Sequence, residues 1–177
     1  SAANTTLAAD GVSSTTVTAQ VHSAFLGNSV TFTTGTGHFT MTSELGSVLR
    51  SVSLKADQNG AATLTYIAPT TVGTAHITAT LAGQSTKSAK IQLTRSYPEQ
   101  ILLRANSATI VAATGNSTAI TATLYKALGN VSVGTLVAFT AVNSVTKKGA
   151  GTIQNTLASN ANGQAVATLF SDGTAQT

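Results

Sequence analysis

Apolar and polar residues alternate with a period of two along most of this chain. In the predicted strand at residues 15–25 (TTVTAQVHSAF), one face holds Val17, Ala19, Val21 and Ser23, and the other holds Thr16, Thr18, Gln20 and His22. A period of two is typical of a strand with one buried face. Glycine-containing turns divide the alternating segments at intervals of about ten residues, which favours an all-β antiparallel sandwich. The other strand segments that we predict are 29–34, 47–56, 61–68, 74–82, 85–94, 101–105, 108–113, 118–125, 135–141, 151–158 and 164–170.

The same order of motifs occurs twice. Gly60 in ADQNGAATLTYIA and Gly163 in SNANGQAVATLFS are 103 residues apart. The other matches in chain order are 13–21 (SSTTVTAQV) with 116–124 (NSTAITATL), 24–28 (AFLGN) with 126–130 (KALGN), and 29–34 (SVTFTT) with 136–141 (LVAFTA). Four landmarks in one order indicate an internal duplication. Each copy has about one hundred residues, the usual size of an immunoglobulin-like sandwich.

We therefore expect two tandem immunoglobulin-like β-sandwich domains, at residues 1–95 and 96–177. The boundary is expected at residues 95–97, beside Pro98. Proline has no backbone N–H, so it interrupts a strand ladder at this point. A linker this short predicts restricted motion between the domains.

Asn-Gly pairs predict tight turns in both copies. Asn59-Gly60 and Asn162-Gly163 precede alternating segments, and both residue types tolerate the positive φ of a type I′ turn. We expect the same hairpin in each copy. Gly27-Asn28 and Gly129-Asn130 are expected to form a second matched pair of structural turns, with a short insertion after the second one.

Composition excludes several classes of function. Charged residues make up 8% of the chain, the net charge is +4, and cysteine and tryptophan are absent. Without cysteine the chain has no disulfide framework, thiolate zinc site or cysteine nucleophile. Scattered cations and few aromatic residues argue against nucleic-acid binding. No apolar run is long enough to span a membrane, and the first residues have no signal-peptide pattern.

Candidate chemistry is sparse, and we expect no catalytic residue, metal site or cofactor. The acids are Asp10, Glu44, Asp57, Glu99 and Asp172, which form no local cluster, and His22, His38 and His76 lack metal-ligand spacing. Lys55, Lys87 or Lys90 could form an isopeptide bond only beside a buried acid. Three Asn-x-Ser/Thr sequons occur, at Asn4, Asn116 and Asn130.

The ordered motifs resemble the group 1 bacterial immunoglobulin-like repeat of invasin and intimin type surface proteins. The motifs that match are AADGVSSTTVTAQV with AATGNSTAITATLY, FLGN with ALGN, and the two Asn-Gly phrases. The resemblance covers nearly the whole chain. It implies rigid extracellular modules that form stalks, and it implies no shared catalytic residue.

The two copies start and stop out of register. The second opens with QILLR (100–104), for which the first has no counterpart, and it lacks partners for the segments 76–83 and 85–94 of the first. A sandwich without these strands would expose unpaired edges. Either a longer chain or another molecule would then supply the missing strands.

The sequence therefore predicts a non-catalytic structural or adhesive module at a bacterial surface, which acts as a rigid stalk or spacer. Its expected partners are neighbouring immunoglobulin-like domains, with a host receptor or glycan as a further partner. One alternative is a subunit of an extracellular filament built by strand complementation. A less favoured alternative is an accessory carbohydrate-binding module, which would need exposed aromatic platforms.

Overall fold

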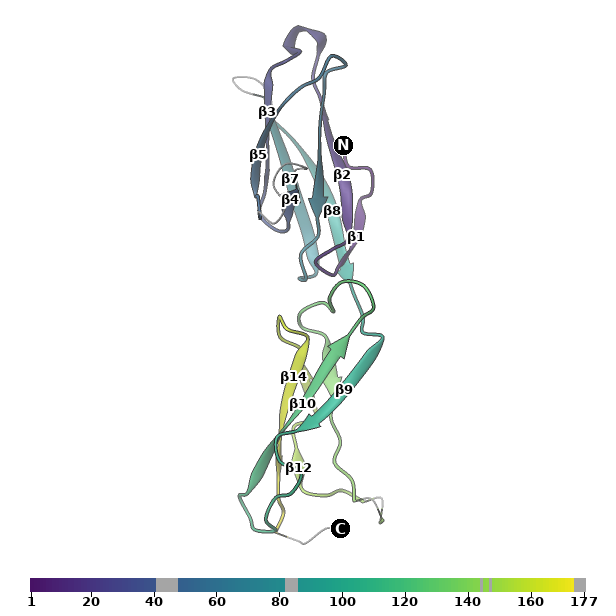
Figure 1. The fold of residues 1–177 in the computed structure, drawn as a ribbon, viewed down its shortest axis with the longest axis vertical. Coiled ribbons are helices and arrows are strands. Elements are labelled where there is room, and N and C mark those ends of the chain that lie inside the picture. The colour runs from purple at the N-terminus through teal and green to yellow at the C-terminus, as the bar shows by residue number, and fades with distance from the viewer. Residues whose placement is uncertain (41–47, 82–85, 144, 147, 174–177) are drawn as a thin grey trace. The chain divides into compact units, whose positions relative to one another are not determined.

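The computed structural model describes residues 1–40, 48–81, 86–143, 145–146 and 148–173. The ends of three predicted strand segments, at Ser47, Ala82 and Ser85, and the acid Glu44 lie outside these residues. The chain divides into two compact units. Unit 1 consists of Ser1–Ser96 with Leu128–Asn130, and unit 2 of Tyr97–Ala127 with Val131–Thr177. The prediction of an all-β fold is confirmed (Figure 1).

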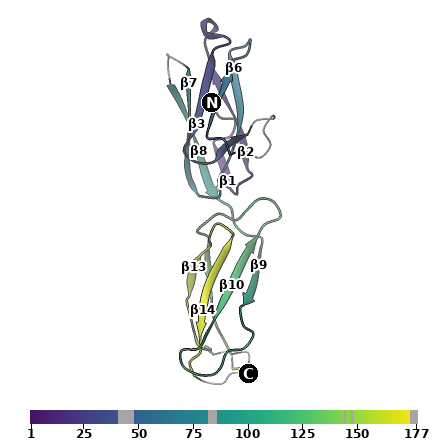
Figure 2. The ribbon, with the colours of Figure 1, turned by 60° about the vertical axis from the view of Figure 1, so that its left-hand side comes forward.

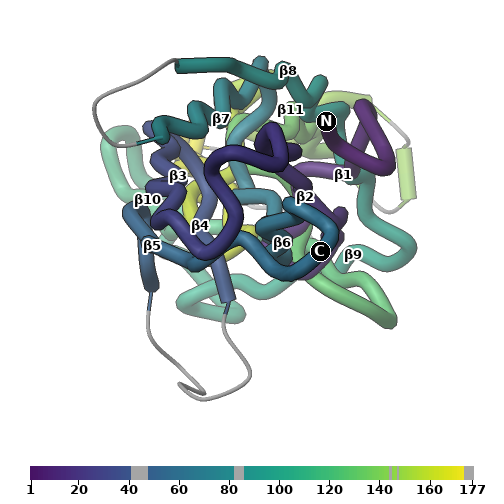
Figure 3. The backbone as a smooth tube through the Cα atoms, turned by 90° about the horizontal axis from the view of Figure 1, so that it is seen from above, coloured from purple at the N-terminus to yellow at the C-terminus, as the bar shows by residue number. Residues whose placement is uncertain are grey.

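Unit 1 is a sandwich of a five-stranded and a three-stranded sheet. The larger sheet has the order β1(Thr6–Ala9), β8(Thr86–Arg95), β7(Gly73–Leu81), β3(Ser29–Thr34), β5(Ser51–Lys55). The smaller has the order β2(Ser14–Gln20), β6(Ala61–Ile67), β4(His38–Thr40). Seen end-on, β8, β7 and β3 follow one another along one layer, and β2 and β6 lie across from them (Figure 3).

The first strand region of unit 1 changes sheets. Residues 1–3 pair with β2 through the bridge between Ala2 and Val17. After bends at Ala3 and Thr5, β1 pairs in parallel with β8, with Leu7 opposite Leu93. The other strand pairs of the unit are antiparallel.

The core of unit 1 lies between the two sheets and is built by the alternation seen in the sequence. Along β6, Ala62, Leu64 and Tyr66 are buried on one face. Phe32 and Tyr66 each make an edge-to-face contact with Phe39, with ring centroids 6.5 and 6.2 Å apart. Such contacts add to the stabilisation from burial of the rings.

The predicted strand at residues 15–25 ends early, at Gln20. Its last three residues form a 3-10 turn, η1(Ser23–Phe25), although the alternation of residue types continues beyond the strand. The irregularity expected at Arg50 is present. Arg50 forms a bend between the bridge at Leu49 and the start of β5, and its carbonyl accepts a hydrogen bond from Thr34 N.

Unit 2 repeats part of this plan. Its larger sheet has the order β12(Thr152–Ile153), β14(Gln164–Phe170), β10(Ser117–Tyr125), β9(Gln100–Ala105), and Figure 2 shows β14, β10 and β9 side by side. A two-stranded sheet pairs β11(Leu136–Ala138) with β13(Thr156–Ala158). The predicted strand at 108–113 is wrong, because these residues form no strand. Their counterpart in unit 1, β1, is held by β8, and no strand of unit 2 occupies that position among its described residues.

Candidate functional site

The Asn59-Gly60 phrase builds a turn that crosses from one sheet to the other. Asp57 accepts the backbone N–H of Gly60 at 3.0 Å, so Gln58 and Asn59 are the central residues of the turn. The Asp57 carboxylate accepts two further N–H groups, from Asn59 and Ala61, both at 2.8 Å. An acidic side chain that caps its own turn in this way is an Asx turn.

Unit 2 repeats these contacts with an amide in place of the carboxylate. Asn160 accepts Gly163 N at its backbone carbonyl, at 3.1 Å. Its side-chain oxygen accepts Asn162 N at 2.9 Å and Gln164 N at 3.0 Å. Both turns therefore use a side-chain oxygen as the acceptor, and a negative charge on that oxygen is not needed.

The prediction of a type I′ hairpin at these two phrases is wrong. β5 pairs with β3 in one sheet, while β6 pairs with β2 in the other, so no hairpin joins β5 to β6. In unit 2, β13 and β14 also lie in different sheets. The alternating segment after each phrase is a strand, but its partner is distant in the sequence, which an Asn-Gly pair cannot indicate.

Each of these glycines ties its turn to the strand that lies beside it. Gly60 has φ 77° and Gly163 has φ 71°. The Gly60 carbonyl accepts Val21 N at 2.8 Å, and the Gly163 carbonyl accepts Leu124 N at 2.9 Å. A Cβ atom on Gly60 would come 2.5 Å from the Val21 carbonyl oxygen, so only glycine fits.

Gly27-Asn28 has a different structural counterpart from the one that the sequence match predicted. In unit 1, Gly27 N donates to the Ala56 carbonyl and Ala56 N donates to the Asn28 carbonyl. In unit 2 the same two bonds join Gly134 and Thr135 to Ser159. The predicted pairing with Gly129-Asn130 is therefore wrong.

The sequence signal that could have identified Gly134 is its position five residues before Phe139, because Gly27 lies five residues before Phe32. Gly134 has φ 77°, and Gly27 has φ 76°. Gly129 and Asn130 instead belong to unit 1, where Asn130 N donates to the Asp10 carbonyl at 2.7 Å. The Leu-Gly-Asn triplet thus occurs twice with two different uses.

The ionisable candidates are not brought together. Among the described residues, no three histidines or acids lie close enough to hold a metal ion. Asp57 caps its turn, and the His22 ring accepts Ala24 N at 3.3 Å. Lys55, Lys87 and Lys90 are all exposed, so none has the buried setting that an isopeptide bond requires. No helix in the described part of the chain could span a membrane.

Tyr66 is an ionisable side chain in an altered environment. It is fully buried, and its hydroxyl donates to the Thr36 carbonyl at 3.1 Å. Burial raises the pKa of Tyr66 above its ordinary value of 10.0, and the Thr36 side chain opposes this rise in part. Tyr66 is therefore a neutral structural residue of the core.

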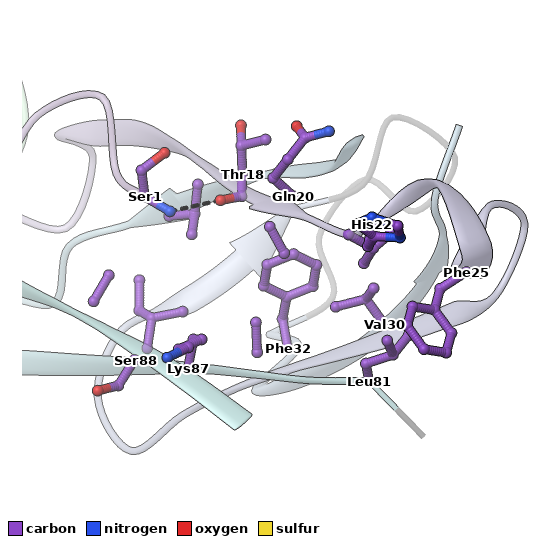
Figure 4. A pocket seen from close by; sticks show the side chains of 16 residues that line it. Ser1, Thr18, Gln20, His22, Phe25, Val30, Phe32, Leu81, Lys87 and Ser88 are labelled. Atoms are coloured by element: carbon purple, nitrogen blue, oxygen red, sulfur yellow. Dashed lines mark hydrogen bonds between the residues drawn. The ribbon is translucent and has the colours of Figure 1, made fainter. Parts of the chain in front are cut away.

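An apolar groove opens along the edge of β2 in unit 1 (Figure 4). Its volume is about 370 Å³. Its walls come from both sheets and include Val17, Ala19 and Val21 on one side and Phe32, Ile77 and Leu81 on the other. Ser1, Gln20 and Lys87 lie at its rim. Such a lining suits aliphatic side chains better than a polar small molecule.

A model of the family described as invasin, domain 3, matches residues 1–96. The chain belongs to the invasin domain 3 family. The resemblance to invasin and intimin type repeats that the ordered motifs indicated is thus confirmed. The match with this family covers unit 1 apart from the segment Leu128–Asn130.

Two solved structures share the fold of this invasin domain 3 chain. The adhesin InvE of Yersinia pseudotuberculosis has a TM-score of 0.58 and 22% identity, and invasin, a bacterial integrin-binding protein, has a TM-score of 0.62 and 21% identity. Each alignment covers 97% of this chain, but only 50% of InvE and 33% of invasin. No curated protein sequence matches the chain.

Proposed function

We propose that this chain is a non-catalytic structural and adhesive module of a bacterial surface protein, and that its immunoglobulin-like units act as a stiff spacer. The match of residues 1–96 to the invasin domain 3 family carries this proposal. The two proteins of similar fold are an adhesin and an integrin-binding protein, which supports a role in attachment. A host receptor or glycan would then be bound by the whole surface protein of which such modules are part.

The pairing of β1 with β8 gives unit 1 a way to resist tension. These strands are parallel, and their hydrogen bonds include Gln92 N to the Thr5 carbonyl at 2.7 Å. A force that pulls the start of β1 away from the end of β8 loads all these bonds at once, in shear. Such loading requires the bonds to break together, whereas a force across the ladder opens them one at a time.

Single-molecule pulling tests the spacer role. The chain has no cysteine, so introduced cysteines are unique handles. We compare two double variants. In Ser1→Cys/Tyr97→Cys the two handles load β1 against β8, and in Ser1→Cys/Asn59→Cys they do not. The first pair is expected to give the higher unfolding force for unit 1. Equal forces, or a lower force for the first pair, would reject a unit built to carry tension.

Strand exchange between copies is a second candidate function, and the inner face of β9 favours it. Ile101 and Leu103 lie opposite Leu124 and Ala122 on the core side of β10, yet they are 58% and 62% exposed. An exposed apolar face beside a sheet edge is a site for strand addition. Sedimentation at micromolar concentration tests this candidate, because filament subunits would form a ladder of oligomers and spacer modules would stay monomeric.

A further inference from the structure

The two Asn-Gly phrases place an unhindered backbone nitrogen directly after an asparagine side chain, because glycine has no Cβ atom. Such a nitrogen attacks the side-chain amide carbon of the asparagine. A new C–N bond forms, the bond to the side-chain nitrogen breaks, and ammonia leaves with the proton from the glycine nitrogen. Water then opens the cyclic succinimide to give aspartate or isoaspartate. Asn59 and Asn162 are both exposed, so water reaches each of them.

The folded turn opposes this reaction in both units. The planar succinimide ring brings the glycine nitrogen into line with the asparagine Cβ, and this rotation lies outside the allowed backbone regions. The peptide plane between the two residues must therefore turn. In the fold its N–H group is held, because Gly60 N donates to the Asp57 carbonyl at 3.0 Å and Gly163 N donates to the Asn160 carbonyl at 3.1 Å.

Unit 1 holds this peptide plane by a second bond. Gln20 Nε2 donates to the Asn59 carbonyl at 2.6 Å. Unit 2 has Thr123 at the same position of its ladder, 103 residues further along the chain. Among the residues that the structure describes, no side chain donates to the Asn162 carbonyl. The plane that must turn is therefore held at both ends in unit 1 and at one end in unit 2.

The space around the two glycines differs in the same direction. A Cβ atom on Gly60 would lie 2.5 Å from the Val21 carbonyl oxygen, whereas one on Gly163 would lie 3.1 Å from the Leu124 carbonyl oxygen. The backbone of the first turn is thus packed more closely against its neighbouring strand. A rotation of the peptide plane is accommodated more easily in unit 2.

We propose that Asn162 is a site of spontaneous deamidation in the folded chain, and that Gln20 protects Asn59 from the same reaction. Water is the only co-reactant, and no enzyme is required. The two sites have the same reacting residues and the same turn, so the difference between them comes from the bond to the asparagine carbonyl and from the packing of the glycine. This modification is independent of the proposed spacer function.

The product alters the turn between β13 and β14. In isoaspartate the backbone runs through the side-chain carbons, so an extra carbon enters the turn. The Asn160 side-chain oxygen accepts the N–H groups on either side of Gly163, at 2.9 and 3.0 Å. A longer backbone at Asn162 moves these two N–H groups apart, and the capping oxygen then loses at least one of them.

Incubation of the full chain at mildly alkaline pH, followed by peptide mass spectrometry, tests the site. We expect Asn162 to lose ammonia about fivefold faster than Asn59 in the folded chain, as the absence of one hydrogen bond predicts. In concentrated urea the two rates should be similar, because both sites are Asn-Gly pairs. Equal rates in the folded chain would overturn the proposal. So would a rate ratio that is unchanged in urea, because the neighbouring residues and not the fold would then set it.

Variants at Gln20 test the protecting bond. Gln20→Met keeps the length of the side chain and removes its donor, and Gln20→Thr supplies the residue type found in unit 2. Gln20 is exposed, so both variants should keep the fold. We expect each to raise the rate at Asn59 about fivefold, while the rate at Asn162 in the same molecule stays constant as the matched control. An unchanged rate at Asn59 in both variants would show that Gln20 does not protect it.

A core variant separates reaction in the folded chain from reaction after unfolding. Phe139→Leu weakens the core of unit 2 and leaves the residues of the turn unchanged. We expect the rate at Asn162 to stay the same, because only the turn has to open. A rate that rises in step with the loss of unit 2 stability would contradict deamidation in the folded chain.

Discussion

Single residues in this protein carry their roles through backbone geometry more than through chemistry. Gly60 combines a positive φ with a close approach to the Val21 carbonyl, and Gly163 occupies the equivalent place with more room, since a Cβ atom there would lie 3.1 Å from the Leu124 carbonyl oxygen. Their common role is to bring a crossover turn onto a neighbouring strand. At Tyr66 burial and one hydrogen bond decide the role, and the side chain stays neutral.

Alanine at Gly60 should destabilise unit 1 by about 2 kcal/mol or more, since it adds a steric clash to a strained φ. Gly163→Ala should cost unit 2 less, because its Cβ meets a carbonyl at a longer distance. Urea unfolding measures both effects. The control is Gly35→Ala, because Gly35 is exposed with open space around it. A loss at Gly35 as large as that at Gly60 would contradict the steric account.

Phenylalanine at Tyr66 should lower the unfolding free energy by about 1 kcal/mol at neutral pH, because the Thr36 carbonyl loses its donor. The raised pKa of Tyr66 makes its contribution fully present below pH 10 and progressively lost as the pH rises through the folded-state pKa. Urea unfolding at a series of pH values should therefore show the difference between the two proteins shrinking above pH 10. A difference that stays constant there would contradict burial of the hydroxyl.

At the scale of elements, the two copies have the same hydrogen bonds between turns and strands, although their loops differ in length. Each crossover turn is capped by a side-chain oxygen and docked on the neighbouring strand through a glycine carbonyl. A second set of bonds is also repeated, because the residues just before β3 and β11, at Gly27 and Gly134, pair through their backbone with Ala56 and Ser159. The same hydrogen bonds between elements are therefore present in both units, although an insertion before Gly134 makes the two sequences hard to align there.

The capping oxygen leads to a prediction for this turn. Asp57→Asn should leave stability within about 0.5 kcal/mol of the original, because Asn160 makes the same two bonds in unit 2. Asp57→Ala should cost about 1 kcal/mol, since the N–H groups of Asn59 and Ala61 lose their acceptor. Urea unfolding distinguishes the two variants. If asparagine were as damaging as alanine, the carboxylate charge would be the important feature.

At the scale of the whole molecule, the described residues form two separate cores. The core cluster of unit 1 has sixteen buried apolar residues and that of unit 2 has seven. Burial of apolar area is the main source of stability, so the two units should differ in stability. The exposed aliphatic residues of β9 lower the burial in unit 2 further.

Two unfolding transitions are therefore expected in urea, with unit 2 unfolding first. Hydrogen exchange followed by mass spectrometry assigns each transition to its peptides. Phe139→Leu should shift only the first transition, and Phe32→Leu only the second, because each ring lies in one core. A single transition that both variants shift equally would mean that the units unfold as one.

The sequence alone determined most of the strands, the duplication and the family, because these depend on local features. Period-two alternation reflects the geometry of one strand, and a repeat reflects order along the chain. Only the tertiary structure decided that Asn59-Gly60 crosses between sheets, that Gly134 matches Gly27, and that β2 borders an open groove. These facts depend on which distant strands meet, and pairing between strands is set by contacts across the whole core.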